Sequence, residues 1–132
     1  MKPVAIGQSH TYKVKTTRAH TADALGNKGV NVVATPVLIG FLEIAATECL
    51  RPACDDGEGS VGTFVNVRHL APAPAEVVIE ATAVVTAVNG RQVEFALSAK
   101  WDKVLLMDGS HGRAVVELAR FFARVGMKAP AG

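Results

Sequence analysis

Residues Thr35 to Arg51 read TPVLIGFLEIAATECLR, and this stretch decides the fold. The Thr35 hydroxyl can accept a backbone N–H as an N-cap, and Pro36 suits the first position of a helix. Nearly every later position is apolar, on all faces, which is typical of a helix buried inside a protein. About 14 residues at ~1.5 Å each span only ~21 Å, less than the ~30 Å apolar thickness of a bilayer. We therefore predict a central core helix.

A single carboxylate, Glu43, lies in the middle of this apolar helix. Its potential partners three and four positions away carry no positive charge: Ile39, Gly40, Ala46 and Thr47. Burial of an unpaired carboxylate costs free energy, so such a group finds a partner, takes up a proton or faces water. Glu43 is therefore either a solvent-facing residue or the carboxylate of a functional site.

The composition indicates one domain over residues 1–132. Hydrophobic residues make up 49% of the chain, which is enough for a sizeable core. The net charge is +2 with scattered basic residues, and the few aromatic residues form no row, so we expect no nucleic-acid partner. The N-terminus lacks the apolar core of a signal peptide and no segment is long enough to span a membrane. We therefore expect a cytoplasmic protein without a membrane partner.

Cys49 and Cys54 are the two cysteines of the chain. No second cysteine pair and no histidine cluster accompanies them, so their spacing does not indicate zinc. We expect reduced thiols and no metal site.

Outside the helix, alternation of apolar and polar residues indicates strands. The predicted strands cover residues 9–17, 63–70, 75–88, 91–102 and 110–125. Asn89-Gly90 is typical of a two-residue type I′ hairpin turn, and Asp108-Gly109 is interpreted as a link before the last strand. Residues 110–125 also fit an amphipathic helix. A strand is preferred there because it buries the apolar face of the hairpin better.

The remaining segments are interpreted as connections. Residues 18–34 show no periodicity and are either a plain connector or a cover over a pocket. Gly57, Gly59 and Gly62 spell GxGxxG, but a dinucleotide fingerprint needs a strand before it and a helix after it, and here the order is reversed. These glycines are interpreted as turns, with close backbone approach at Gly62. The order strand, loop, core helix and four antiparallel strands predicts an α+β fold whose sheet curls around the helix.

These elements and motifs resemble the hotdog-fold thioesterases, and within them the fluoroacetyl-CoA-specific thioesterase group. The segments that carry the resemblance match in order and spacing: 35–43, 57–63, His69, 71–74, 89–91 and 110–115. It covers residues 35–132 and, more weakly, the first strand. It implies a hotdog fold, with an antiparallel sheet of about five strands wrapped around one long central helix. It also implies a homodimer, or a dimer of dimers, whose sheets join edge to edge and whose acyl-CoA substrate binds at the subunit boundary.

By position, the resemblance implies five site residues: the catalytic Thr35, Glu43 and His69, and the substrate-binding Gly62 and Arg113. It implies hydrolysis of a short-chain acyl-CoA thioester to the free acid and CoA, with no cofactor beyond the CoA of the substrate. The fluoroacetate-specific enzyme has an aromatic-rich lid ahead of the catalytic Thr, with a Phe that screens the acyl group. Residues 19–34 are shorter and hold no Phe, Tyr or Trp, which implies weaker selectivity for fluoroacetyl-CoA.

The chemistry of these side chains suits thioester hydrolysis. His69 can exchange a proton near neutral pH, Glu43 can orient the imidazole or activate water, and Thr35 becomes nucleophilic beside a base. Backbone N–H groups at the helix start or at Gly62 could stabilise the oxyanion. Thr35 and Glu43 lie eight residues apart, ~12 Å along a helix, which is too far for a direct hydrogen bond. We therefore predict that the catalytic set is completed across the dimer boundary.

Each residue also has a purely structural interpretation. Thr35 could only cap the helix, His69 could be a core histidine, and Arg113 could pair with an acid at the surface. Two alternative functions stay open: a hotdog acyl-CoA hydratase or dehydratase, and a non-catalytic acyl-CoA-binding protein.

Overall fold

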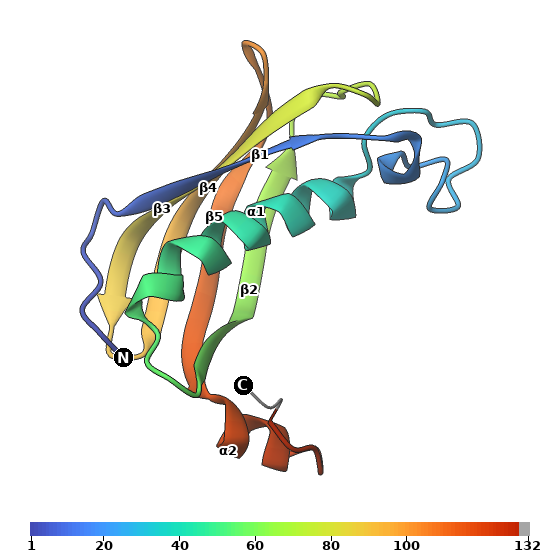
Figure 1. The fold of residues 1–132 in the computed structure, drawn as a ribbon. Coiled ribbons are helices and arrows are strands. Elements are labelled where there is room, and N and C mark those ends of the chain that lie inside the picture. Colours follow the sequence, from blue (N-terminus) through green and yellow to red (C-terminus); the bar gives the residue numbers. More distant parts are fainter. Residues whose placement is uncertain (130–132) are drawn as a thin grey trace.

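Five antiparallel strands curve around helix α1 (Thr35–Leu50), which lies across the concave face of the sheet (Figure 1). The computed structural model describes residues 1–129, so the last three residues of the predicted domain 1–132 lie outside the described part. The strands, in their order across the sheet, are β1 (Ser9–Lys15), β3 (Val78–Asn89), β4 (Gln92–Trp101), β5 (Val104–Glu117) and β2 (Glu58–His69). This arrangement confirms the predicted α+β fold.

Helix α1 begins at Thr35, but its N-cap residue is Ala34, which offers no side-chain hydrogen bond. The prediction that Thr35 caps the helix is therefore wrong, because Thr35 already occupies the first helical position. The helix ends at Leu50, and Pro52 in the following 3-10 helix (Arg51–Ala53) has no N–H with which to continue it. Among residues 1–129, no helix combines the length and the apolar character needed to cross a membrane.

One face of α1 packs on the inward side chains of the sheet and forms the core. The buried α1 residues are Leu38, Phe41, Leu42, Ala45, Ala46, Cys49 and Leu50. Facing strand β4 buries the alternate residues predicted for it: Val93, Phe95, Leu97 and Ala99. On the other side of the helix, Ile44 keeps 40% of its surface exposed and Glu43 is half-buried. The predicted burial on all faces is therefore wrong for this side of the helix.

The last predicted strand is wrong at both ends. β5 begins at Val104, before the predicted start at 110, and it ends at Glu117, where α2 (Leu118–Ala123) replaces the predicted continuation to 125. Gly109 lies inside β5, and a side chain there would collide with the Asn66 backbone on β2. This glycine therefore permits close contact between two strands and does not form a link. β2 in turn begins at residue 58, earlier than predicted, because it pairs with β5 along its whole length.

The hairpin between β3 and β4 turns at Gly90-Arg91, because Asn89 pairs with Gln92. The predicted turn at Asn89-Gly90 is therefore one residue too early. Gly90 has φ +60° whereas Arg91 does not have a positive φ. Glycine at the first central position is typical of a type II′ turn, so the predicted type I′ turn is also wrong.

The segment between β1 and α1 packs at the N-terminal end of α1 (Figure 1). Arg18–His20 forms a short 3-10 helix, and Thr21 bridges Val33 just ahead of α1. The His20 ring lies edge-on to the Phe41 ring, with the centroids 5.4 Å apart. These contacts hold the segment against the N-terminal end of α1.

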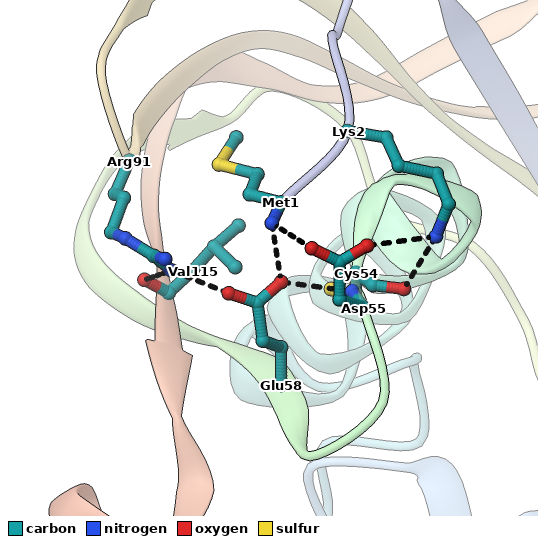
Figure 2. A network of polar contacts seen from close by, with 7 residues as sticks. All are labelled: Met1, Lys2, Cys54, Asp55, Glu58, Arg91 and Val115. Atoms are coloured by element: carbon teal, nitrogen blue, oxygen red, sulfur yellow. Dashed lines mark hydrogen bonds and ion pairs between the residues drawn. The ribbon is translucent and has the colours of Figure 1, made fainter.

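A network of charges joins the start of β2 to the β3–β4 turn (Figure 2). The Glu58 carboxylate accepts hydrogen bonds from the Asp55 backbone N–H at 2.8 Å and from the Arg91 Nη1 at 2.7 Å. The Met1 ammonium lies 2.9 Å from the same carboxylate. The Asp55 N–H, the Met1 ammonium and the Arg91 side chain together lower the pKa of Glu58 to about 2.

Candidate active site

Thr35 and His69 meet where α1 begins and β2 ends. The Thr35 Oγ1 lies 2.7 Å from the His69 Nδ1, and these two side chains are called the hydroxyl–imidazole pair below. Both residues are exposed, so the interpretation of His69 as a core histidine is wrong. When Nδ1 carries no proton, the hydroxyl donates to it. The ring can then take that proton while the oxygen attacks an electrophile.

Glu43 has its partner on β5. The Arg113 Nη1 donates to the Glu43 Oε2 at 3.5 Å, and the two side chains form an ion pair. The Arg113 side chain is only 6% exposed, whereas that of Glu43 is 42% exposed. The interpretation of Arg113 as a member of a surface pair is therefore wrong. Glu43 faces solvent, as one of its two interpretations predicted, and it also neutralises a buried cation.

Further contacts hold the Arg113 guanidinium in place. Its Nε donates to the Ser60 Oγ at 3.0 Å, and its Nη2 donates to the Ser60 carbonyl oxygen at 2.9 Å. Its Nη1 also lies 3.3 Å from the His111 Nε2. Burial lowers the pKa of Arg113, but a guanidinium stays protonated in proteins. A fixed positive charge therefore lies behind the Glu43 carboxylate.

His111 belongs to this group and has no role in the sequence prediction. Its ring is fully buried, its Nδ1 lies 2.8 Å from the Phe64 carbonyl oxygen, and it packs near the Phe95 ring. Burial lowers the pKa of His111, and the neighbouring Arg113 charge acts in the same direction. The sequence could have indicated that His111 lies beside Arg113, because residues i and i+2 of a strand lie on the same face of the sheet.

Gly62 gives the carboxylate room. The register between β2 and β5 shifts just after Gly62, where a bulge interrupts the ladder. A Cβ atom at Gly62 would lie 3.0 Å from the Glu43 Oε2 and 3.4 Å from the His111 Cε1. The close approach predicted at Gly62 is therefore present, and it is made to the Glu43 side chain. The carboxylate cluster, as it is called below, comprises Glu43, Ser60, Gly62, His111 and Arg113.

The structure brings the predicted site residues together in two groups within one chain. From Thr35 to Glu43, α1 rises ~12 Å, and from Gly62 to His69, β2 extends ~23 Å. Within residues 1–129 of one chain, no hydrogen bond joins the hydroxyl–imidazole pair to the carboxylate cluster. The hydroxyl–imidazole pair and the carboxylate cluster are therefore two separate groups within one chain.

The described residues 1–129 contain no group of three or more His, Cys, Asp and Glu side chains placed to hold a metal ion. Cys49 and Cys54 are free thiols, and burial raises the pKa of each. The groups that the site itself offers are a hydroxyl, an imidazole, a carboxylate and a guanidinium. This set suits acyl transfer to a hydroxyl or to water.

Known proteins are similar to this chain in sequence and in fold. Residues 16–119 match the family model of the fluoroacetyl-CoA-specific thioesterase. The chain is 37% identical over 101 residues to the fluoroacetyl-CoA thioesterase of Streptantibioticus cattleyicolor, which covers 76% of this chain and 73% of that protein. A solved structure of the fluoroacetyl-CoA thioesterase superposes with a TM-score of 0.89 at 29% identity, over 98% of this chain and 100% of that one. A thioesterase superfamily member from Thermus thermophilus shares the fold, with a TM-score of 0.88 at 23% identity over 95% and 93% of the two chains.

Proposed function

Because the chain belongs to the fluoroacetyl-CoA-specific thioesterase family, we propose that it hydrolyses short-chain acyl-CoA thioesters to the free acid and CoA. It is a thioester hydrolase with the hotdog fold. The observation that carries the substrate proposal is the exposed hydroxyl–imidazole pair, with 2.7 Å between Thr35 Oγ1 and His69 Nδ1. Hydrolysis by these groups calls for no cofactor beyond the CoA of the substrate.

The hydroxyl–imidazole pair acts in both halves of the proposed reaction. His69 takes the Thr35 proton as Oγ1 bonds to the thioester carbonyl carbon, and the C–S bond then breaks. The CoA thiolate leaves and takes the proton from the imidazolium. Water next attacks the Thr35 ester, His69 takes a water proton and returns it to Oγ1, and the free acid departs. Rapid quenching followed by mass spectrometry tests for this acyl-enzyme, whose absence would favour direct attack by water.

The active enzyme is a homodimer joined along β2. This strand is a sheet edge of 12 residues, and Phe64 and Val65 keep 42% and 37% of their surfaces exposed. A long unpaired edge is a template for pairing with another strand. A two-fold axis between Val65 and Asn66 would set His69 of one chain opposite Gly62 of the partner subunit, because antiparallel strands run in reverse. The hydroxyl–imidazole pair of one chain then meets the carboxylate cluster of the other.

Mixing two inactive variants tests this shared site. Thr35→Ala and Glu43→Gln are each expected to retain about 1% of wild-type activity or less, and a mixture unfolded and refolded together forms mixed dimers. Each mixed dimer contains one site in which both Thr35 and Glu43 are intact, so random pairing restores about a quarter of wild-type activity. If both residues of one chain served the same site, the mixture would stay inactive and the proposal would be rejected.

The acyl pocket accepts small acyl groups without a strong preference for fluorine. Residues 19–34 contain no Phe, Tyr or Trp, and the His20 ring of this segment packs against Phe41. We expect kcat/KM for acetyl-CoA and fluoroacetyl-CoA to agree within about tenfold, the low end of the ~10–200-fold discrimination between substrates that differ by one small group. CoA release from a panel of short acyl-CoAs measures this, and a preference above about a hundredfold would contradict it.

The His69→Ala variant tests the assigned chemistry in the same assay. It lacks the proton acceptor, so CoA release is expected to be slower by about 10²–10⁴-fold. Equal rates in both proteins would reject the role of His69. Turnover of an enoyl-CoA without thiol release would favour the hydratase alternative.

The cytoplasm is the proposed location. The free thiols of Cys49 and Cys54 suit a compartment in which cysteines stay reduced. Fractionation of the source cells with antibody detection would check this location, and sedimentation velocity would separate a dimer from a dimer of dimers.

A further inference from the structure

We propose that His111 is a positioning residue for the hydrolysis: its neutral ring, protonated on Nδ1, fixes the Arg113 guanidinium, and Arg113 in turn orients the Glu43 carboxylate. This inference rests on the proposed thioesterase function. His111 does not reach the hydroxyl–imidazole pair of its own chain, so its effect passes through its neighbours.

The protonation of the His111 ring follows from its two contacts. The Phe64 carbonyl oxygen, 2.8 Å from Nδ1, can only accept a hydrogen bond, so Nδ1 must carry the proton. The Arg113 Nη1, 3.3 Å from Nε2, can only donate, so Nε2 must offer its lone pair. A second proton would place an imidazolium against a guanidinium inside the protein. Both contacts therefore select the same neutral tautomer.

The Arg113 guanidinium connects His111 to Glu43, because its Nη1 contacts both side chains. Ser60 binds Nε and Nη2, so Nη1 is the nitrogen left for both His111 and Glu43. One of its two N–H groups is directed to the His111 lone pair, and the other is then free to point at the Glu43 Oε2. Without the acceptor at His111, the Nη1 loses one of its two partners and the guanidinium can tilt. The carboxylate would then lose its fixed direction.

A core histidine without such a role would need only to fill space. His111 does fill space, because it is fully buried with its ring centroid 6.2 Å from that of Phe95. The test must therefore separate the volume of the ring from its acceptor nitrogen. His111→Phe keeps an aromatic ring beside Phe95 but removes both nitrogens. His111→Gln removes the ring but returns a carbonyl oxygen that can accept from Arg113.

Kinetics of these variants make the first test. His111→Phe is expected to lower kcat for acetyl-CoA by about ten- to a hundredfold, the effect of losing a hydrogen bond to a charged group, while KM stays within about threefold. His111→Gln is expected to restore kcat to within about fivefold of wild type, despite its poorer packing. Phe95→Leu is the matched packing control, and it should lower Tm while leaving kcat nearly unchanged. All assays are run well below the Tm of each variant.

The tautomer makes the second test. Long-range proton–nitrogen correlation spectra of the ¹⁵N-labelled wild-type protein are expected to show one histidine protonated on Nδ1 and bare on Nε2 at pH 7, and this signal should be missing in His111→Phe. An Nε2–H tautomer or an imidazolium at His111 would overturn the inference, as would an active wild type whose kcat is unchanged by His111→Phe. A wild type that hydrolyses no acyl-CoA would instead refute the proposed function, and this inference with it.

Discussion

Arg113 is a positive charge with 6% of its side chain exposed, and its neighbours account for each of its nitrogens. Ser60 and His111 accept hydrogen bonds from it, and Glu43 supplies the opposite charge. Within the described part of the chain, every buried side-chain nitrogen and oxygen has a partner. Glu43 thus has two tasks, because it neutralises the buried cation and also presents a carboxylate at the helix surface.

Glu43→Gln separates the charge of this residue from its size. We expect kcat to fall by about 10²–10⁴-fold if the carboxylate handles a proton or orients the imidazole. We also expect the free energy of unfolding to fall by about 1–2 kcal/mol, less than for a fully buried pair because Glu43 is 42% exposed. Urea unfolding and CoA release measure the two effects. Glu48→Gln lies on the same helix as Glu43 and alters a surface pair with Arg51, so it is the control and should change neither quantity appreciably.

Gly62→Ala tests the room left for the carboxylate. The new Cβ would lie 3.0 Å from the Glu43 Oε2, so the carboxylate must shift by a few tenths of an ångström. We expect kcat to fall about tenfold with little change in Tm, because the displaced group is the end of a flexible side chain. Gly40→Ala is the control: its Cβ meets nothing within 4 Å and should stabilise α1 by about 0.5–1 kcal/mol. An unchanged kcat in Gly62→Ala would show that the position of the carboxylate is not critical.

At the scale of elements, local pattern was enough to predict the helix and the alternating strands, and contacts between distant segments caused the errors. Gly109 was interpreted as a link because glycine often breaks strands, but its role is to let β5 pass close to Asn66 on β2. The turn was placed one residue too early because Asn-Gly is typical of the two central residues of a type I′ turn. In the structure Asn89 is instead the last paired residue of β3, opposite Gln92. The short helix α2 has too few residues for its period to be distinguished from alternation.

The network of charges around Glu58 should make the free energy of unfolding depend on pH in the acidic range. Glu58 has its pKa lowered from 4.5 to about 2 in the folded chain. The unfolded chain therefore takes up this proton first, so the stabilisation from Glu58 is complete above about pH 4.5 and is lost as the pH falls toward 2. Glu58→Gln should flatten this part of the curve of unfolding free energy against pH. Urea titrations of both proteins from pH 7 to pH 2.5 measure this, and parallel curves would contradict it.

At the scale of the whole molecule, the proposed sharing of the site between two chains predicts that activity depends on association. Val65→Lys places a charge in the middle of the β2 edge, and charged side chains on an edge oppose strand pairing. We expect a folded monomer by sedimentation velocity, with CoA release reduced by about a hundredfold or more because each chain then has half a site. Val78→Lys, at an exposed position on β3, is the control and should remain dimeric and active. A fully active monomer would show that one chain is sufficient.

The resemblance to a known family proposes which residues belong to the site, but the sequence does not predict how these residues are connected. Thr35, Glu43, His69, Gly62 and Arg113 could be located through the resemblance. The pairing of Thr35 with His69 spans 34 residues and that of Glu43 with Arg113 spans 70, so neither can be derived from local periodicity. His111 was missed because a lone histidine on an alternating strand looks the same whether it fills the core or fixes a neighbour.

At the N-terminus of α1, the Thr35 hydroxyl can either cap the helix or contact His69. A threonine at the start of a helix commonly bonds its hydroxyl to the helix's own free amides, which is worth ~1 kcal/mol. Here the N-cap is Ala34, which cannot do this, and the Thr35 oxygen instead faces an imidazole. The helix therefore begins without a side-chain cap, and the Thr35 oxygen stays available to the hydroxyl–imidazole pair.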